Sequence, residues 1–448
     1  MSTIAIVPSD VTSKRMLADR LAGRLTSAGH RVVTVVDVAA VGGAEPHGEY
    51  RLVPLRANAG GRVPPWRPDL YRRASRRAAA ELDPAALEAV LQDIAADLLI
   101  VDIEEYEVLI LAHALPSPPR LAVLCSFFDV WPIAGLGPND PGPARGPGAR
   151  VRGELEWWWL WTRMRLYDAK RQLRSGDVDR ISISRALARR LGVRRQFTAR
   201  QWLHPFAPRW TPMLVCNAIE LDIPHDARPG VVHIGSLLEP ADPEGRGAID
   251  DPQLEAMVER ARSNGRPIVV CVFGTLTTGD RDVLVDRVGG LARLRPGIEF
   301  VVGLSAAGRE AELDELPNVV ARRWIPQRAL LAVADAAFVH TGNATLHECV
   351  VAGVPMLVRP LGVNDQQRNA ARVVRHGIGV LDDGGTVESL AERLDGLLDD
   401  NDSRRRLDEL RDHVMRYERD SVAVAAIEHL VHADPTRAPV GTRHRRPA

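Results

Sequence analysis

Residues 336–348, AAFVHTGNATLHE, place side chains that could bind an anion at the junction of a strand and a helix. An apolar run ends near His340, and a helix is expected to start directly after it. Free backbone N–H groups at a helix N-terminus attract phosphate, and Gly342 allows close approach. His340 adds a ring donor and Thr345 a hydroxyl. Since a helix dipole contributes only about 0.3–1 kcal/mol, a phosphate would need several of these donors. An ordinary strand–turn–helix would show the same pattern.

Further motifs flank this turn in a fixed order. Residues 322–380 resemble the donor-binding signature of GT-B nucleotide-sugar glycosyltransferases, the superfamily of UDP-glycosyltransferases and antibiotic glycosyltransferases. The matching residues are Trp324, Pro326, Gln327, His340, Gly342, Thr345, Glu348, the run GVP at 353–355, Asp365, Gln366, Asn369 and Ala370. So many matches in order across about sixty residues make the motif highly specific.

The resemblance implies a role for each matching residue. Trp324 would stack on the nucleobase, and Gln327 and Glu348 would bond the ribose. The diphosphate would be held by His340, Gly342 and Thr345, and the sugar hydroxyls by Asp365 and Gln366. Donors aimed at the leaving diphosphate would stabilise the charge that develops there in the transition state.

Two positions depart from the family pattern. Thr341 stands where relatives usually carry Gly or Cys, and Ala344 where they carry Gly or Asn, so Asn343 would have to supply one phosphate donor. Thr275, in the run FGT after an earlier strand, resembles the phosphate-facing strand end of the family. No metal-binding pattern is visible, because the HE pair at 347–348 lacks the second histidine of a zinc helix. We expect no cofactor besides the nucleotide-sugar substrate.

The opening stretch, IAIVPSDVTSKRM at residues 4–16, should form the floor of the acceptor site. In many relatives this loop carries a catalytic histidine, since an imidazole titrates near neutral pH. A gapless match places Lys14 in that slot, whereas a match to relatives with aspartate places Asp10 there. Asp10 would also suit a helix N-cap. Asp102, at the end of an apolar run, corresponds to the aspartate that orients the histidine; it could contact Lys14 or cap the next helix.

Residues 155–173, LEWWWLWTRMRLYDAKRQL, form an aromatic helix. Trp157 and Trp161 share one face of it. The helix could pack on the sheet, or its tryptophans could line the site of an apolar or planar acceptor. A helix with Trp and Arg also fits weak association with a membrane edge.

These residues must be positioned by two α/β units. Short apolar runs alternate with amphipathic segments in both halves of the chain, a pattern that predicts parallel sheets with right-handed crossovers. The resemblance implies the GT-B fold, in which two Rossmann-like β/α/β domains face each other across a cleft. We expect an acceptor domain (1–225), a linker (226–252), a donor domain (253–415), a last helix packing back on the first domain (416–433) and a disordered tail (434–448).

Composition indicates which partners and which cellular compartment to expect. The chain has 58 basic and 58 acidic residues, so bulk charge does not suggest a nucleic-acid partner. The four cysteines form no CxxC pair and lie in or near apolar runs, as buried thiols in a reducing compartment do. Neither a signal peptide nor a membrane-spanning run is visible, so we expect a cytoplasmic protein. The oligomeric state is not readable from the sequence.

The sequence therefore predicts an inverting glycosyltransferase. It would move a hexose or deoxyhexose from a UDP- or dTDP-sugar to a small, apolar or aromatic acceptor, such as a bacterial natural product or a lipid-like molecule. Because the usual loop histidine is missing, two alternatives stay open: a non-catalytic nucleotide-sugar-binding accessory protein, and a nucleotide-sugar epimerase of the same fold.

Overall fold

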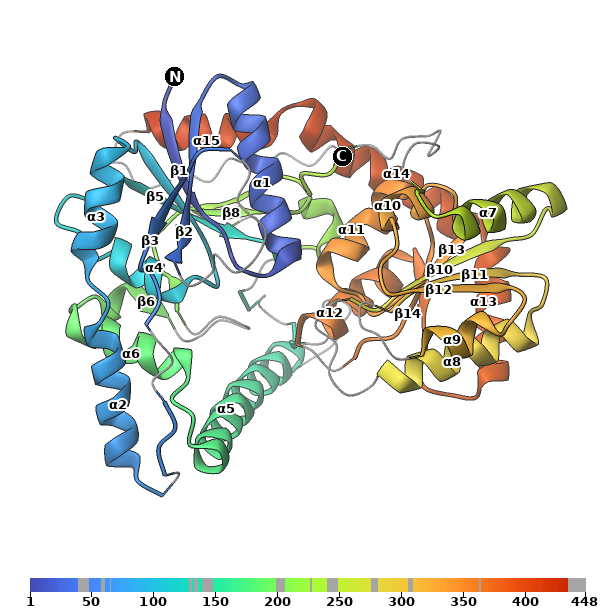
Figure 1. The fold of residues 1–448 in the computed structure, drawn as a ribbon, viewed down its shortest axis with the longest axis horizontal. Coiled ribbons are helices and arrows are strands. Elements are labelled where there is room, and N and C mark those ends of the chain that lie inside the picture. The colour runs from blue at the N-terminus through green and yellow to red at the C-terminus, as the bar shows by residue number, and fades with distance from the viewer. Residues whose placement is uncertain are drawn as a thin grey trace.

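The computed structural model describes residues 1–38, 48–57, 61–64, 66–128, 131–132, 136–138, 148–198, 206–225, 228–239, 249–274, 281–304, 309–361 and 364–433. This part of the chain forms two α/β domains side by side, each built around its own parallel sheet (Figure 1). The expected pair of Rossmann-like domains is therefore present. The predicted tail, residues 434–448, lies outside the described residues.

The first sheet has seven parallel strands in the order β3–β2–β1–β4–β5–β8–β9. They are β1 (Thr3–Val7), β2 (Arg31–Asp37), β3 (Tyr50–Val53), β4 (Leu98–Asp102), β5 (Arg120–Cys125), β8 (Met213–Val215) and β9 (Val231–His233). β9 corrects the prediction that the linker begins at residue 226. This short apolar run pairs with β8 and completes the sheet edge, so the first domain extends at least to His233.

The remaining elements of the first domain are mostly helices. They are α1 (Thr12–Ser27), α2 (Pro68–Ala80), α3 (Pro84–Asp93), α4 (Tyr106–Ala112), α5 (Ala149–Ser175), α6 (Arg180–Arg190), the 3₁₀ turns η2 (Arg194–Gln196) and η3 (Ile219–Leu221), and the small antiparallel pair β6 (Phe197–Thr198) and β7 (Ala207–Pro208).

The second sheet has six parallel strands in the order β12–β11–β10–β13–β14–β15. They are β10 (Ile268–Val272), β11 (Glu299–Gly303), β12 (Val319–Arg322), β13 (Ala336–Val339), β14 (Met356–Val358) and β15 (Gly379–Leu381). The helices that follow the first domain are α7 (Pro252–Asn264), α8 (Arg281–Leu294), α9 (Glu310–Asp314), α10 (Gln327–Leu331), α11 (Asn343–Ala352), α12 (Asn364–His376), α13 (Val387–Leu398), α14 (Asn401–Arg419) and α15 (Val422–His432).

Both sheets bury apolar side chains on both faces. Successive side chains of a strand point to opposite sides, and helices cover each side. On β1, Ile4 and Ile6 join the core under α1 and α15, whereas Ala5 and Val7 join the core under α2, α3, α4 and α6. The second sheet is covered by α7, α11, α12 and α14 on one face and by α8 and α13 on the other. All four cysteines are buried, and none of them forms a disulfide.

The end of the chain returns to the first domain. α14 belongs to the second domain's core, but α15 lies across α1 (Figure 1), where its buried side chains join the layer of Ile4. Two further contacts fix this return: Arg24 Nη2 lies 2.6 Å from Glu418 Oε2, and Arg120 Nη2 donates to the Ala433 carbonyl at 2.7 Å.

Candidate functional site

The carboxyl ends of the two sheets meet at the interface between the domains. Asn343, at the start of α11, donates its side-chain amide to the carbonyl of Ser126, which directly follows β5. In open α/β sheets, ligands bind in the crevice outside the carboxyl ends of the strands. The candidate site is therefore built from the loops that follow β1 and β4 in the first domain and β13 in the second.

His340, after β13, has its ring wedged between two glycines. A Cβ atom built on Gly274 or Gly342 would lie 2.6 or 2.5 Å from its Nε2, so neither position has room for a side chain. Its Nδ1 lies 3.3 Å from the Val272 carbonyl, and because only an N–H can bond a carbonyl, this contact places the proton on Nδ1. Burial lowers the pKa of His340, so the ring is neutral at pH 7. Nε2 then donates to a phosphate only if the ring gains a second proton.

The N-terminus of α11 carries no capping side chain. Gly342 is its N-cap residue, so the first N–H groups of the helix face the junction without competition from a capping oxygen. Thr345 is buried in the first turn, and its Oγ1 lies 3.3 Å from Gln327 Nε2. The predicted phosphate donor Asn343 instead bonds Ser126 across the interface.

Thr341 shows how the departure from the family pattern is accommodated. Its φ angle is +63°, a conformation that favours glycine and is strained for a β-branched residue. Its hydroxyl lies 2.6 and 2.7 Å from the carbonyls of His340 and Gln366, and its own carbonyl accepts a hydrogen bond from Asn369 at 3.0 Å. These bonds hold the turn in the shape that glycine would adopt without them.

Two of the residues assigned to the nucleoside, Gln327 and Glu348, lie together on α10 and α11. Gln327 Nε2 donates to Glu348 Oε2 at 2.6 Å. Burial raises the pKa of Glu348, opposed by the guanidinium groups of Arg20 and Arg328. Arg20 belongs to α1, so the first domain contributes a positive charge next to the ribose pair. Trp324 is 72 % exposed, so its ring is available for stacking.

The residues assigned to the sugar begin α12. Gln366 is buried, and its side-chain oxygen accepts a hydrogen bond from the Leu361 N–H at 2.7 Å, which leaves the amide nitrogen for a ligand. Burial raises the pKa of Asp365, and the charges of Lys14 and Glu104 act on it from the first domain. Thr275 lies outside the described residues. Among the residues that the structure describes, no three His, Cys, Asp or Glu side chains form a metal-binding group.

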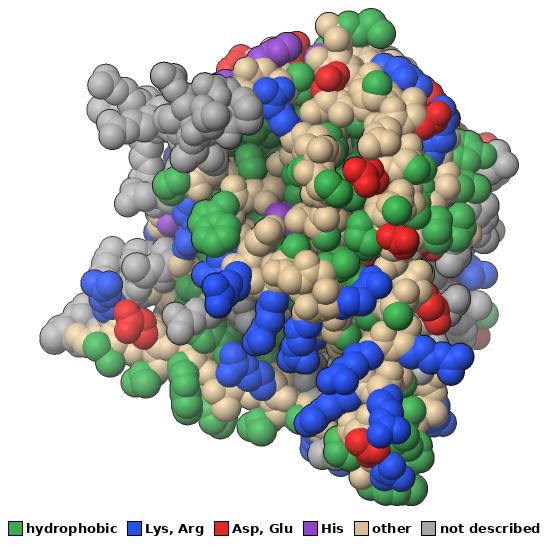
Figure 2. Space-filling view, turned by 90° about the vertical axis from the view of Figure 1, so that its left-hand side faces the viewer, with side chains coloured by type: hydrophobic (Ala, Val, Ile, Leu, Met, Phe, Trp, Pro, Cys, Tyr) green, Lys and Arg blue, Asp and Glu red, His purple; other side chains and the backbone are tan. Residues whose placement is uncertain are grey.

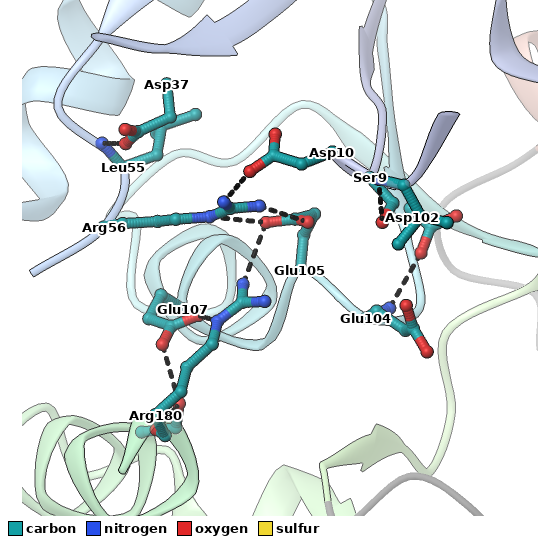
Figure 3. A network of polar contacts seen from close by, with 12 residues as sticks. Ser9, Asp10, Asp37, Leu55, Arg56, Asp102, Glu104, Glu105, Glu107 and Arg180 are labelled. Carbon is teal, nitrogen blue, oxygen red and sulfur yellow. Dashed lines mark hydrogen bonds and ion pairs between the residues drawn. The ribbon is translucent and has the colours of Figure 1, made fainter. Parts of the chain in front are cut away.

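Asp10 belongs to a network of charges after β1 (Figure 3). Its carboxylate pairs with Arg56, whose Nη2 also lies 2.7 Å from Glu105 Oε1. Arg180 then links Glu105 to Glu107, at 2.9 and 2.7 Å. The prediction that Asp10 could cap the first helix is wrong, because Val11 is the N-cap residue of α1 and no side chain caps that helix.

Lys14 and Asp102 form a second cluster, with Glu104. Lys14 pairs with Glu104 and lies 4.2 Å from the centre of the Phe127 ring. Asp102 Oδ1 accepts from the Glu104 N–H at 2.9 Å, while its buried Oδ2 has no hydrogen-bond partner among the described residues. Burial raises the pKa of Asp102 to about 7, although the Lys14 ammonium opposes this shift. Lys14 therefore acts on Asp102 within one cluster, whereas the ion pair of Asp10 is with Arg56.

The aromatic helix α5 is anchored by one tryptophan. Trp157 is 3 % exposed, and its Nε1 donates to the Leu136 carbonyl at 2.7 Å. The Arg368 guanidinium lies 5.8 Å from the centre of its ring. Trp161 is half-buried and lies 5.8 Å from Trp157, ring centre to ring centre. In this structure Trp157 joins α5 to the second domain, and its ring is not open to an acceptor.

Sequence reasoning did not single out four residues that shape this site. They are Arg20, Arg56, Glu104 and Ser126. For Glu104 a signal existed, since it follows Asp102 by two residues at the end of a buried strand. The other three act through partners far away in the chain or through a backbone carbonyl, which no local pattern reveals.

Comparison with known proteins confirms the recognised resemblance over the second half of the chain. Residues 209–411 match the family model described as UDP-glucoronosyl and UDP-glucosyl transferase. An oleandomycin glycosyltransferase of Streptomyces antibioticus is 36% identical over 117 residues, which are 25% of this chain and 26% of the relative. An anthocyanidin 3-O-glucosyltransferase of Hordeum vulgare is 30% identical over 181 residues, 40% of this chain and 39% of the relative. The matches thus span about a quarter to two fifths of these relatives.

The fold comparison covers nearly the whole chain. The crystal structure of the glycotransferase of kitacinnamycin superimposes with a TM-score of 0.66 and 21% identity, over 96% of this chain and 99% of that one. The two-domain α/β architecture is therefore the GT-B fold predicted from the sequence. Among the described residues, no helix has both the length and the apolar character needed to cross a membrane.

Proposed function

We propose, from the premise of a GT-B chain whose residues 209–411 match the UDP-glycosyltransferase family, that this protein is an inverting glycosyltransferase. It transfers a hexose or deoxyhexose from a UDP- or dTDP-sugar to a small apolar or aromatic acceptor, with no metal or other cofactor. The observation that carries the proposal is the donor cradle: an uncapped helix N-terminus at Gly342, the Gln327–Glu348 pair and the exposed Trp324 ring.

The cradle suits the departure of a nucleoside diphosphate. As the acceptor oxygen bonds to the anomeric carbon, the bond from that carbon to the phosphate oxygen breaks, and negative charge gathers on the diphosphate. The N–H groups of α11 already point to that place, so they stabilise this charge without reorganising. His340 adds a donor when the phosphate keeps its ring protonated.

The acceptor's proton needs a base in the first domain, and we assign it to Glu104. Asp10 is the weaker candidate, since its carboxylate is paired with Arg56, which also binds Glu105. Glu104 is partly exposed, and its charge raises the pKa of Asp365 across the interface. Asp102 orients Glu104 through its backbone N–H, and Lys14 holds its carboxylate. Asp102 and Lys14 are then positioning residues.

The names of the relatives support an apolar acceptor. One acts on oleandomycin and another on anthocyanidins, by their titles, and a third is named for sterols, which points to acceptors with large apolar frames.

Nucleotide binding tests the proposal directly. UDP or dTDP should raise the melting temperature, because a ligand at a hundred times its Kd stabilises the folded state by about 2.7 kcal/mol. Trp324→Ala should reduce this shift without lowering the melting temperature of the free protein, since the ring is exposed. Trp210→Ala, an equally exposed tryptophan of the first domain, is the matched control.

The same experiment separates the rival functions. If no nucleoside diphosphate changes the melting temperature at millimolar concentration, the proposal is wrong. Binding without transfer to any acceptor would indicate an accessory protein, and conversion of the donor sugar without an acceptor would indicate an epimerase.

A further inference from the structure

The helix α5 has two apolar sides, and the protein covers only one of them. Trp157 faces the protein, whereas the opposite side carries five apolar side chains that are 59–62 % exposed. These are Val151, Leu155, Trp158, Trp159 and Leu166, which we call the α5 stripe. At 3.6 residues per turn they fall within about 100° of the helix circumference. An exposed apolar stripe of this extent marks a surface that is covered when the protein works.

Basic side chains flank the α5 stripe on both sides. Arg152, Arg163 and Lys170 follow one edge of it, Arg165 lies at the other, and all four are exposed; Arg152 also pairs with Glu156, one turn further along, at 3.6 Å. Long basic side chains can keep their charge at the surface of a bilayer while the apolar side chains between them sink below the headgroups.

A second basic feature lies between α2 and α6. A groove of about 770 Å³ is lined by Arg72, Arg76, Arg185, Arg189 and Arg190. The first four are exposed, and none has an acidic partner among the residues that the structure describes. Figure 2 shows Lys and Arg side chains gathered over the lower part of this face. Since the whole chain has equal numbers of acidic and basic residues, this is a local separation of charge.

The α5 stripe and the groove are continuous. Ala169 lies 18 residues after Val151, about five turns, and therefore on the same side of α5; it also lines the groove. The end of α5 is joined to the chain before α2, where the Val63 N–H donates to the Gly176 carbonyl at 2.9 Å. Trp66, 77 % exposed, follows this contact and precedes the groove residue Pro68.

We propose that this combined surface binds an anionic phospholipid bilayer. The arginines would attract the phosphates of the headgroups, and the α5 stripe with Trp66 would enter the interface, so that the protein is held on the membrane without crossing it. An acidic protein could neutralise the arginines, but it would leave the apolar side chains along four turns of α5 uncovered. The proposal goes beyond the proposed function, and its test needs no sugar donor.

Sedimentation with vesicles tests the proposal. The full chain should bind vesicles of phosphatidylcholine and phosphatidylglycerol in equal amounts, bind pure phosphatidylcholine much less, and detach as salt is raised. Arg72→Gln with Arg76→Gln should weaken binding about fivefold per charge removed. Leu155→Ser with Leu166→Ser should weaken it about tenfold or more at every salt concentration. Both pairs change exposed residues, so the melting temperature should not fall.

Matched variants on the second domain serve as controls. Leu294→Ser on α8 and Arg262→Gln on α7 also change exposed side chains, and they should leave vesicle binding unchanged. Failure to sediment with the anionic vesicles at low salt would overturn the proposal. It would also be overturned if the controls lowered binding as much as the test variants, or if soluble polyglutamate competed as well as vesicles, which would assign the groove to an acidic protein.

Discussion

At the scale of single residues, the first domain replaces a missing histidine with a cluster of charges. In the gapless match Lys14 takes the slot of that histidine, and its side chain is paired with Glu104. In the proposed mechanism Lys14 is therefore not the base itself; it holds the carboxylate of the base, Glu104, in position. The buried Asp102 adds a charge that changes near neutral pH, because burial raises its pKa to about 7.

Two substitutions separate the base from its positioning residue. Glu104→Gln should lower sugar transfer about a hundredfold or more, the usual contribution of a general base. Asp102→Asn should lower it less and change its pH dependence. In the unchanged protein, transfer should rise as the pH rises through 7, because the ionised Asp102 makes Glu104 a stronger base. That rise should be absent in Asp102→Asn, measured as kcat/KM against pH.

A stability measurement distinguishes this role from damage to the fold. The pKa of Asp102 is about 7 in the folded state against 3.8 ordinarily, so burying the charged form destabilises the protein increasingly from pH 4 to 7. Asp102→Asn should therefore raise the melting temperature at pH 8 and change it little at pH 4. If Asp10→Asn abolishes transfer while Glu104→Gln does not, Asp10 is the base.

At the scale of elements, the turn from β13 to α11 works as one unit. Gly342 is needed for space alone, since its φ of −60° suits any residue. Gly274 is needed for its φ of +72° as well as for space. Both glycines keep the His340 ring in the position from which it faces the helix N-terminus.

Gly342→Ala should destabilise the protein by about 1–3 kcal/mol, because the new methyl group displaces the packed imidazole. It should also weaken UDP binding. In the double variant with His340→Ala, the methyl group meets no ring, so the added cost of Gly342→Ala should disappear. Thermal unfolding of the single and double variants measures this coupling. Gly396→Ala is the control: this glycine lies inside α13 with open space around it, so alanine should stabilise by about 1 kcal/mol.

Equal losses from Gly342→Ala with and without His340 would contradict this explanation.

The donor motif and the strand–helix alternation could be predicted because each is a local pattern in the sequence. The positive φ of Thr341 could not, since it depends on hydrogen bonds to carbonyls that only the folded turn brings together.

At the scale of the whole molecule, one buried ion pair joins the two domains. Arg372, on α12, lies 2.6 Å from Asp222, which follows η3 in the first domain, and both are almost fully buried. Although burial favours the neutral form, Arg372 holds the pKa of Asp222 below its ordinary value. Phe128, from the first domain, lies in the second core, and the centre of its ring is 4.0 Å from the Arg372 guanidinium.

Asp222→Asn should destabilise the protein by about 3–5 kcal/mol, because it leaves a buried guanidinium without its counter-charge. Asp222→Leu together with Arg372→Leu should cost less, since neither charge of this pair is then left without the other; the buried Arg368, whose charge also acts on Asp222, is present in both variants. Denaturant unfolding at pH 7 measures both. The contribution of the pair is present above pH 3.8, the ordinary pKa of Asp, and is lost as the pH falls through the lower folded value. A double variant as unstable as the single one would show that packing, not charge, matters here.

The contacts at the interface between the domains could not be predicted from the sequence. Asp222 and Arg372 are 150 residues apart, and Asn343 and Ser126 are 217 apart. Even Asp10 and Arg56, 46 residues apart, sit on separate elements. The second domain's site follows from residues within sixty positions of one another, whereas the first domain's site depends on which loops the sheet order brings together. The prediction that β9 belongs to the linker is wrong for the same reason: its three residues do not indicate which strand they pair with.

The return of α15 to the first domain has a consequence for biosynthesis. Ala423, Ile427 and Val431 complete the layer of Ile4 and Leu21, so a layer that begins with the first strand is covered by residues made only after the second domain. While the ribosome builds the second domain, this apolar layer remains uncovered, a state in which chains aggregate or recruit chaperones. The first domain can therefore complete this layer only after α15 has been made.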